Sequence, residues 1–258
     1  MHVFSICPSK SSLTHLPLIP PFRLLLYSRM PPPFSIEALL SKHDSKDHLE
    51  RVVMRLEGRS LWRKFDELGT EMIVTKTGRR MFPTLQVSLS NLTPSYSYSL
   101  IVDVEPLDNK RYRYSFHHSQ WTATGPGEAE LPSRSFLHPD SPSSGQQWMK
   151  NAISFDRLKL TNNQLDHNGH IIVNSMHRYR PRIQLVCHSL HNSHRFFTFP
   201  ETSFIAVTAY QNHRITTLKI ESNPFAKGFR ECEVDEASTF SLLLPFLSNT
   251  FSATRSSP

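Results

Sequence analysis

The chain has 258 residues, a formal net charge of +7 and a sequence pI near 9.5. This length fits one domain of roughly 180 to 200 residues with tails, or two small ones. The three cysteines include no pair at zinc-ligand spacing, and this odd, sparse count excludes a disulfide framework. The positive charge favours an anionic partner, nucleic acid first and an acidic membrane surface second, although a merely basic soluble protein is equally compatible with it.

Residues 1 to about 50 are rich in Pro, Ser and apolar residues, and we expect them to form a mostly disordered arm. The apolar stretch 13–27 is too short and too interrupted by proline to span a membrane. One segment of the arm could form an apolar face of a short helix, made of Phe34, Ile36, Leu39 and Leu40. Too short to be stable alone, it could be a docking peptide, a hydrophobic piece of tail, or the start of the folded domain.

A folded body is predicted to begin near Arg51. A first helix is predicted from apolar side chains at helical spacing, which are Leu61, Trp62, Phe65 and Leu68. Gly69 is predicted to end this helix. Alternation of apolar and polar residues then predicts half-buried strands over residues 85–89 and 96–104, joined by a turn at 91–94. Residues 111–116 alternate arginine with aromatic side chains.

The second half of the body is predicted to consist of short strands separated by turns. A loop rich in Pro, Ser and Gly covers residues 125–145, a helical turn is expected at 146–152, and Asn168-Gly169 is a strong hairpin signal. The stretch 215–220 is short and β-branched, and the chain from Asn223 has helical or 3₁₀ character. Strands are expected at 154–160, 171–173, 182–188, 196–199 and 204–210. Many short strands favour a mainly β fold, either a sandwich or a barrel.

Signatures of enzymes are absent from the sequence, which lacks a Gly-rich phosphate loop, an H-E-x-x-H motif and a G-x-S-x-G motif. The histidine groups at 117–118 and 188–194 have no Cys or carboxylate partners at ligand spacing. We therefore expect these histidines to lie at the surface, and we expect no catalytic residue, no metal and no cofactor.

Polar and cationic side chains gather at two places where nucleic acid could bind. The stretch Gly78 to Pro83 presents Arg79 and Arg80 at a turn, and one Arg can donate two hydrogen bonds to guanine in the major groove. A strand end carries four polar side chains that can bind phosphate, Thr208, Tyr210, Gln211 and Asn212. The alternatives are a pair of solvated arginines and ordinary strand-end polarity.

Two phenylalanines lie four residues apart near the C-terminal end, and in a helix Phe225 and Phe229 would share one face. Lys227 and Arg230 flank that face. The rings could anchor the segment in the core, or they could insert into a minor groove as apolar wedges. Their spacing alone favours the core.

Taken together, several blocks in this order resemble the T-box domain of the Brachyury family, from about Val52 to Glu231. The resemblance rests on Leu61-Trp62 and on residues 69–76, 78–83, 138–142, 158–163, 174–179, 206–212 and 223–230. The stretches 148–150, 168–172 and 211–216 are most similar to the subgroup named for T-box one.

The resemblance implies an immunoglobulin-like β-sandwich of the p53-like type, with short helices, one of them C-terminal. It implies a nuclear transcription factor that binds double-stranded DNA at an AGGTGTGA-like T-box element, as a monomer or a DNA-dependent dimer. Arg79 or Arg80 would contact guanine in the major groove, and Phe225 and Phe229 would enter the minor groove. The residues expected to hold the DNA backbone are Lys159, Thr208, Tyr210, Lys227 and Arg230. The domain would cover residues 51–232, between the arm 1–50 and a short disordered tail 233–258.

The segment Phe34 to Leu40 also resembles the engrailed-homology-one peptide, which recruits Groucho-type corepressors. That resemblance implies repression of genes transcribed by RNA polymerase II. The sequence departs from the family at Gly125-Pro126-Gly127, where relatives have Gly-Lys-Ala, and one cation near the DNA would be lost. The alternative is therefore a protein-interaction adaptor that binds DNA weakly.

Overall fold

The computed structural model describes residues 48–129, 134–190 and 193–223. The peptide Phe34 to Leu40 and the segment Phe225 to Arg230 lie outside these residues. The first half contains β1 (Val53–Leu56), α2 (Arg59–Leu68), β2 (Glu71–Ile73), β3 (Arg79–Arg80), β4 (Gln86–Ser90), β5 (Ser97–Pro106), β6 (Lys110–Ser115) and β7 (Gln120–Pro126). The second half contains β8 (Phe136–Leu137), β9 (Ser143–Ser144), α3 (Gly145–Lys150), β10 (Ile153–Ser154), β11 (Lys159–Thr161), β12 (Ile171–Ile172), β13 (Arg178–Cys187), β14 (Ser193–Thr198), η1 (Pro200–Thr202), β15 (Phe204–Val207) and α4 (His213–Ser222).

The fold is mainly β, as the sequence predicts, with sheets that enclose one large apolar core. The largest sheet has the strand order β2-β15-β13-β5-β8, with β14 paired to β13 and β9 paired to β5. A second sheet has the order β1-β4-β10, and a third has the order β12-β11-β3. Strands β5 and β13 pair antiparallel over most of their length. This arrangement agrees with the β-sandwich implied by the resemblance.

The main core is built from the apolar faces of strands in the seven-stranded sheet and in both three-stranded sheets. The residues with period-2 spacing in β4 and β5 point into it, including Val87, Leu89, Tyr98, Leu100 and Val102. Because successive side chains of a strand point to opposite faces, the alternation in sequence predicts this burial correctly. At the N-terminal end of the described chain, the Arg195 guanidinium on β14 donates hydrogen bonds to the carbonyl oxygens of Leu49, Glu50 and Val52.

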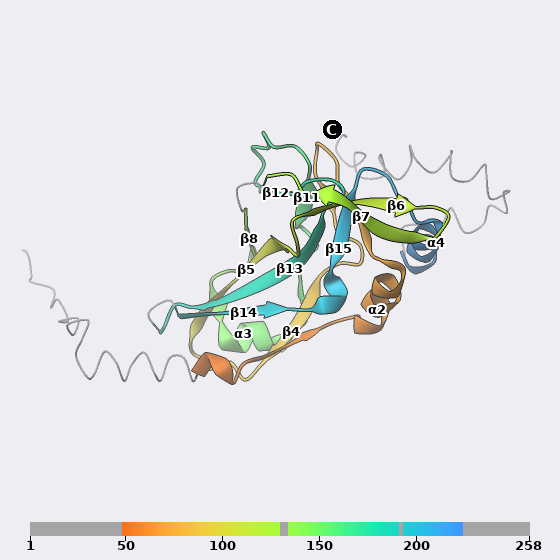
Figure 1. Cartoon of the computed structure of the whole chain (residues 1–258). Coiled ribbons are helices and arrows are strands. Elements are labelled where there is room, and N and C mark those ends of the chain that lie inside the picture. The colour runs from red at the N-terminus through yellow and green to blue at the C-terminus, as the bar shows by residue number, and fades with distance from the viewer. Residues whose placement is uncertain (1–47, 130–133, 191–192, 224–258) are drawn as a thin grey trace, which may run out of the picture. The chain divides into compact units, whose positions relative to one another are not determined.

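A second cluster of apolar side chains lies apart from the main core. It is formed by Phe65, Ile73, Ile205, Val207, Tyr210 and Ile215. Phe82, Tyr112, Trp121 and Leu218 pack against it. Strands β6 and β7 form a separate two-stranded antiparallel sheet, called the ribbon below. The cluster therefore joins α2, the turn after β3, the β6–β7 ribbon and α4. Figure 1 shows β11, β12 and the ribbon at one end of the sandwich and α3 toward the other.

The first predicted helix is confirmed as α2, which ends at Gly69 in the left-handed conformation, with φ 77°. The helical turn predicted at 146–152 is confirmed as α3, and its N-cap Ser144 accepts a hydrogen bond from the Gln147 N–H. None of the helices in the described part of the chain is long and apolar enough to cross a membrane.

Three predictions of local structure are wrong, and one stretch left without a prediction is a helix. The stretch 154–160 is not one strand but the end of β10 and the start of β11, because the turn at 155–158 changes the chain direction. The loop predicted at 125–145 contains the short strands β8 and β9, which pair with β5. Asn168-Gly169 does not form a hairpin, because β11 and β12 pair in parallel. The β-branched stretch 215–220 is helical, since it lies within α4.

Replacing Gly145 with alanine is expected to destabilise the domain by about 2 kcal/mol or more, because the new Cβ would overlap the carbonyl oxygen of Thr93. Gly125→Ala is the matched control, since no atom lies within 4 Å of its added Cβ, and we expect a change of about 0.5 kcal/mol or less. Urea denaturation measures both free energies of unfolding. Equal stability of the two variants would contradict the close approach of α3 to the 91–96 turn.

Candidate nucleic-acid interface

Two parallel strands bring the two predicted DNA-contacting segments to one edge of the large sheet. Strands β2 and β15 pair in parallel, with Ile73 opposite Val207, and the Val74 N–H donates to the Val207 carbonyl at 2.8 Å. The chain after β2 leads to the turn with Arg79 and Arg80, and the chain after β15 leads to residues 208–212. Because parallel strands end at the same edge, both segments begin side by side.

The arginine turn is paired with β11 in a way that gathers positive charge. In the antiparallel register, Arg80 lies directly opposite Lys159, and Arg79 lies opposite Leu160. Opposite residues of such a pair share one face of the ladder. Leu160 is fully buried, so Arg79 is on the inner side and is half-buried, whereas Arg80 is exposed. The structure thus brings together three of the predicted site residues, Arg79, Arg80 and Lys159.

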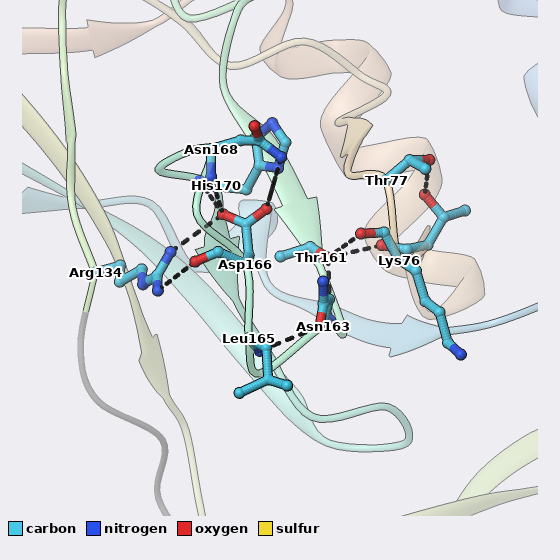
Figure 2. A network of polar contacts seen from close by, with 10 residues as sticks. Lys76, Thr77, Arg134, Thr161, Asn163, Leu165, Asp166, Asn168 and His170 are labelled. Atoms are coloured by element: carbon cyan, nitrogen blue, oxygen red, sulfur yellow. Dashed lines mark hydrogen bonds and ion pairs between the residues drawn. The ribbon is translucent and has the colours of Figure 1, made fainter.

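Hydrogen bonds from β11 hold the approach to the turn. The Thr161 hydroxyl donates to the carbonyl oxygens of Thr75 at 2.8 Å and Lys76 at 3.3 Å, as Figure 2 shows. Gly78 has φ +79°, and a Cβ on it would lie 2.7 Å from Nδ1 of the His170 ring. The turn therefore requires glycine here for two reasons, its left-handed conformation and the close approach of the imidazole.

The buried carboxylate of Asp166 fixes the loop that carries His170. It accepts hydrogen bonds from the His170 N–H at 3.0 Å, the His170 ring at 2.9 Å, the Asn168 N–H at 3.1 Å and the Arg134 guanidinium at 3.1 Å (Figure 2). The guanidinium also donates to the Asp166 carbonyl at 2.7 Å. Burial alone would raise the pKa of Asp166, but the hydrogen bonds and charge of His170 outweigh it and hold this pKa below its ordinary value.

The second predicted segment turns most of its polar atoms inward. Tyr210 is buried in the second cluster, and the Gln211 side chain donates to the Ala209 carbonyl at 3.0 Å. The Asn212 side chain caps α4 by accepting from the Arg214 N–H at 3.0 Å, and it donates to the Leu68 carbonyl at 2.9 Å. Only Thr208 of the four predicted side chains is exposed. This geometry favours a positioning role for Tyr210, Gln211 and Asn212 over contact with phosphate.

A buried glutamate on β2, which the sequence reasoning missed, organises this segment. Glu71 Oε2 accepts from the Gln211 N–H at 2.8 Å, and Oε1 accepts from the Asn212 N–H at 2.9 Å and from the Trp121 indole at 3.2 Å. The ammonium of Lys219, also buried, donates to the Glu71 carbonyl oxygen at 2.8 Å and lies 4.5 Å from the centroid of the Tyr210 ring. The available signal was an acidic residue directly before the apolar run 72–74.

Burial dominates the ionisation of this pair. It raises the pKa of the Glu71 carboxyl, against the N–H donors of Gln211 and Asn212 and the charge of Lys219, and it lowers the pKa of Lys219. The positive charge of Arg79 also lowers the pKa of Lys219, which places the arginine turn within electrostatic range of α4. The four predicted residues Phe225, Lys227, Phe229 and Arg230 follow α4 and lie outside the described residues.

Comparison with known proteins identifies the family. The T-box family model matches residues 54–231. The chain is 54% identical over 239 residues to the T-box transcription factor mls-1 of Caenorhabditis elegans, covering 84% of this chain and 95% of that protein. It is 55% identical to TBX1 of Danio rerio, covering 72% of this chain and 42% of that protein, and 55% identical to human TBX10, covering 72% and 51%. The chain therefore spans about half or less of these two relatives. These identities confirm the resemblance to the family and to its T-box-one subgroup.

Asp166→Asn is expected to lower the thermal midpoint at neutral pH, because the NH₂ group of an amide cannot accept from the N–H donors that surround the carboxylate. A depressed pKa means that the ionised carboxylate stabilises the native state above the ordinary pKa of 3.8, and that this stabilisation is lost as the pH falls from there through the lower pKa of the folded state. The difference in midpoint between the wild type and the variant should therefore narrow once the pH falls below about 4. Asp156→Asn, at an exposed position, should show no such trend. A difference in midpoint that grows as the pH falls would contradict a stabilising role of the ionised Asp166.

Proposed function

Because the chain belongs to the T-box family, we propose that it is a sequence-specific transcription factor that binds double-stranded DNA in the nucleus. The relatives described above are named as transcription factors, which supports a regulator and not an enzyme. The excess of basic residues suits a polyanionic partner. The proposed DNA-binding domain is residues 51–232, flanked by the arm 1–50 and the tail 233–258.

The opposition of Arg80 and Lys159 on the β3–β11 ladder is the observation that carries this proposal. A phosphate beside the two side chains would accept charge-assisted hydrogen bonds from both. Two cations held in register by the backbone, Arg80 exposed and Lys159 half-buried, are therefore suited to bind the DNA backbone or a base edge at a fixed position.

The proposed recognition follows from the two segments at this edge. Arg79 or Arg80 reads a guanine in the major groove, and Lys159 and the exposed Thr208 contact the backbone. Phe225 and Phe229 enter the minor groove, with Lys227 and Arg230 on the phosphates beside it. The proposed site is a T-box element of the AGGTGTGA type. The protein binds it as a monomer or as a dimer formed on DNA.

The departure at Gly125-Pro126-Gly127 need not weaken DNA binding. In the β6–β7 ribbon, Lys110 lies opposite Pro126 and Arg111 lies opposite Gly125. The ribbon thus keeps Lys110 next to the position at which relatives have lysine, whereas Arg111 forms an ion pair with Glu128. No contact in the described structure specifically favours the adaptor function, and a gel-shift assay with a T-box half-site separates it from the proposed one.

Regulation by this protein is proposed to be repression of genes transcribed by RNA polymerase II. The support is the sequence of the arm, where Phe34, Ile36, Leu39 and Leu40 match the spacing of a Groucho-binding peptide. Such a peptide gains its structure in the groove of the corepressor. Replacing Phe34 and Leu39 with alanine should relieve repression of a reporter gene without changing affinity for DNA.

Arg79→Ala and Arg80→Ala are expected to weaken binding to a T-box duplex, by about 1–3 kcal/mol for the arginine that contacts guanine. The same change should relax selectivity at a single guanine, as measured by fluorescence anisotropy on duplexes substituted at each position. Arg63→Ala, on the exposed side of α2, is the matched control and should leave affinity and selectivity unchanged. Equal losses for all three arginines would indicate a general effect of charge.

Affinity should also fall steeply as the salt concentration rises, because each phosphate contact releases counterions. Lys159→Ala is expected to lower the slope of log K against log salt by about 1 and to leave sequence selectivity intact. A flat salt response of the wild type would contradict binding through the phosphate backbone.

A further inference from the structure

One residue, Glu71, holds both ends of α4 through two different groups. Its carboxylate accepts from the N–H groups of Gln211 and Asn212, at the N-terminus of the helix. Its main-chain carbonyl accepts from the Lys219 ammonium, which comes from the last turn. Glu71 and Lys219 are both buried, so water does not compete for these bonds. The helix is therefore fixed to β2 both along its axis and about it.

Helix α4 determines where the chain continues toward the predicted minor-groove segment. The helix ends at Ser222, and the Asn223 N–H donates to the Lys219 carbonyl at 2.9 Å. Lys219 thus contributes its side chain to Glu71 and its carbonyl to the last described residue. Any rotation of α4 would displace the point at which residues 224–230 begin.

The same glutamate is connected to the arginine turn. Strand β2 runs from Glu71 to Ile73 and continues directly into the turn with Arg79 and Arg80. Glu71 also accepts from the indole of Trp121, on the β6–β7 ribbon, which packs against the second cluster together with Phe82 of the turn. The bonds of Glu71 therefore set α4 relative to the strand that delivers the arginines.

From this geometry we propose that Glu71 is a positioning residue for DNA recognition. It fixes α4 on β2, and so sets the point at which the chain continues after Asn223 toward the proposed minor-groove contact. The role rests on the proposed DNA binding. It acts through the phenylalanines that follow α4 and not through Arg80, whose position is set by β11 and Thr161.

A double-mutant cycle with the full chain tests this role. Glu71→Gln keeps the shape of the side chain, but its NH₂ group cannot accept from the N–H donors around it. We expect affinity for a T-box duplex to fall about tenfold at a temperature where circular dichroism shows the protein folded. In a Phe229→Ala background the further loss should shrink to about twofold or less, and in an Arg80→Ala background it should stay about tenfold. The same loss in both backgrounds would overturn the proposal.

Controls separate positioning from loss of stability. Val87→Ala creates a cavity in the main core, away from α4, and is expected to leave the affinity of the folded protein unchanged. A comparable loss of affinity in Val87→Ala would overturn the positioning role. If Glu71→Gln does not fold, Lys219→Met removes the bond to the Glu71 carbonyl and leaves the carboxylate bonds in place, and the same cycle applies to it. A wild-type chain that fails to bind the duplex would refute the proposed function itself. If the wild type binds but the losses from Glu71→Gln and Phe229→Ala simply add, only the role of Glu71 is refuted.

Discussion

The parallel pairing of β2 with β15 is the constraint on which the rest of the site depends. It sets two loops from distant parts of the sequence next to each other, one with Arg79 and Arg80 and one with residues 208–212. All four residues of β15 are buried, so a shift of register by one residue would misplace every side chain of the strand. The large sheet therefore sets where the chain enters the arginine turn, and β11 with Thr161 fixes the turn itself.

Two buried carboxylates extend this order from the sheet into the loops. A buried carboxylate is costly unless hydrogen bonds satisfy it, and the groups that satisfy it are fixed in return. Asp166 orders the loop beneath Gly78, and Glu71 orders the start of α4. Neither loop has a ladder of backbone hydrogen bonds to define its conformation, which explains why acidic side chains are placed inside the domain at these two points.

The sequence predicts the elements whose signals are local and misses those that depend on distant partners. Val87 and Leu89 alternate with polar residues and are buried as expected, and Gly69 ends α2. By contrast, α4 is β-branched, and it is helical because Asn212 caps it and Ile215 is buried in the second cluster. The arginine turn was found from its charge. Glu71 was not, because its partners at 121, 211, 212 and 219 are remote in the sequence.

The two acidic residues that order the surroundings of the arginine turn, Asp166 and Glu71, are both buried. A carboxylate exposed beside Arg80 and Lys159 would compete with DNA phosphate for these two cations. Asp166 and Glu71 avoid this competition because both are buried, and backbone N–H groups donate to both carboxyl groups; the half-buried Arg134 also donates to Asp166. The carboxyl groups that order the surroundings of the arginine turn are thus satisfied inside the domain.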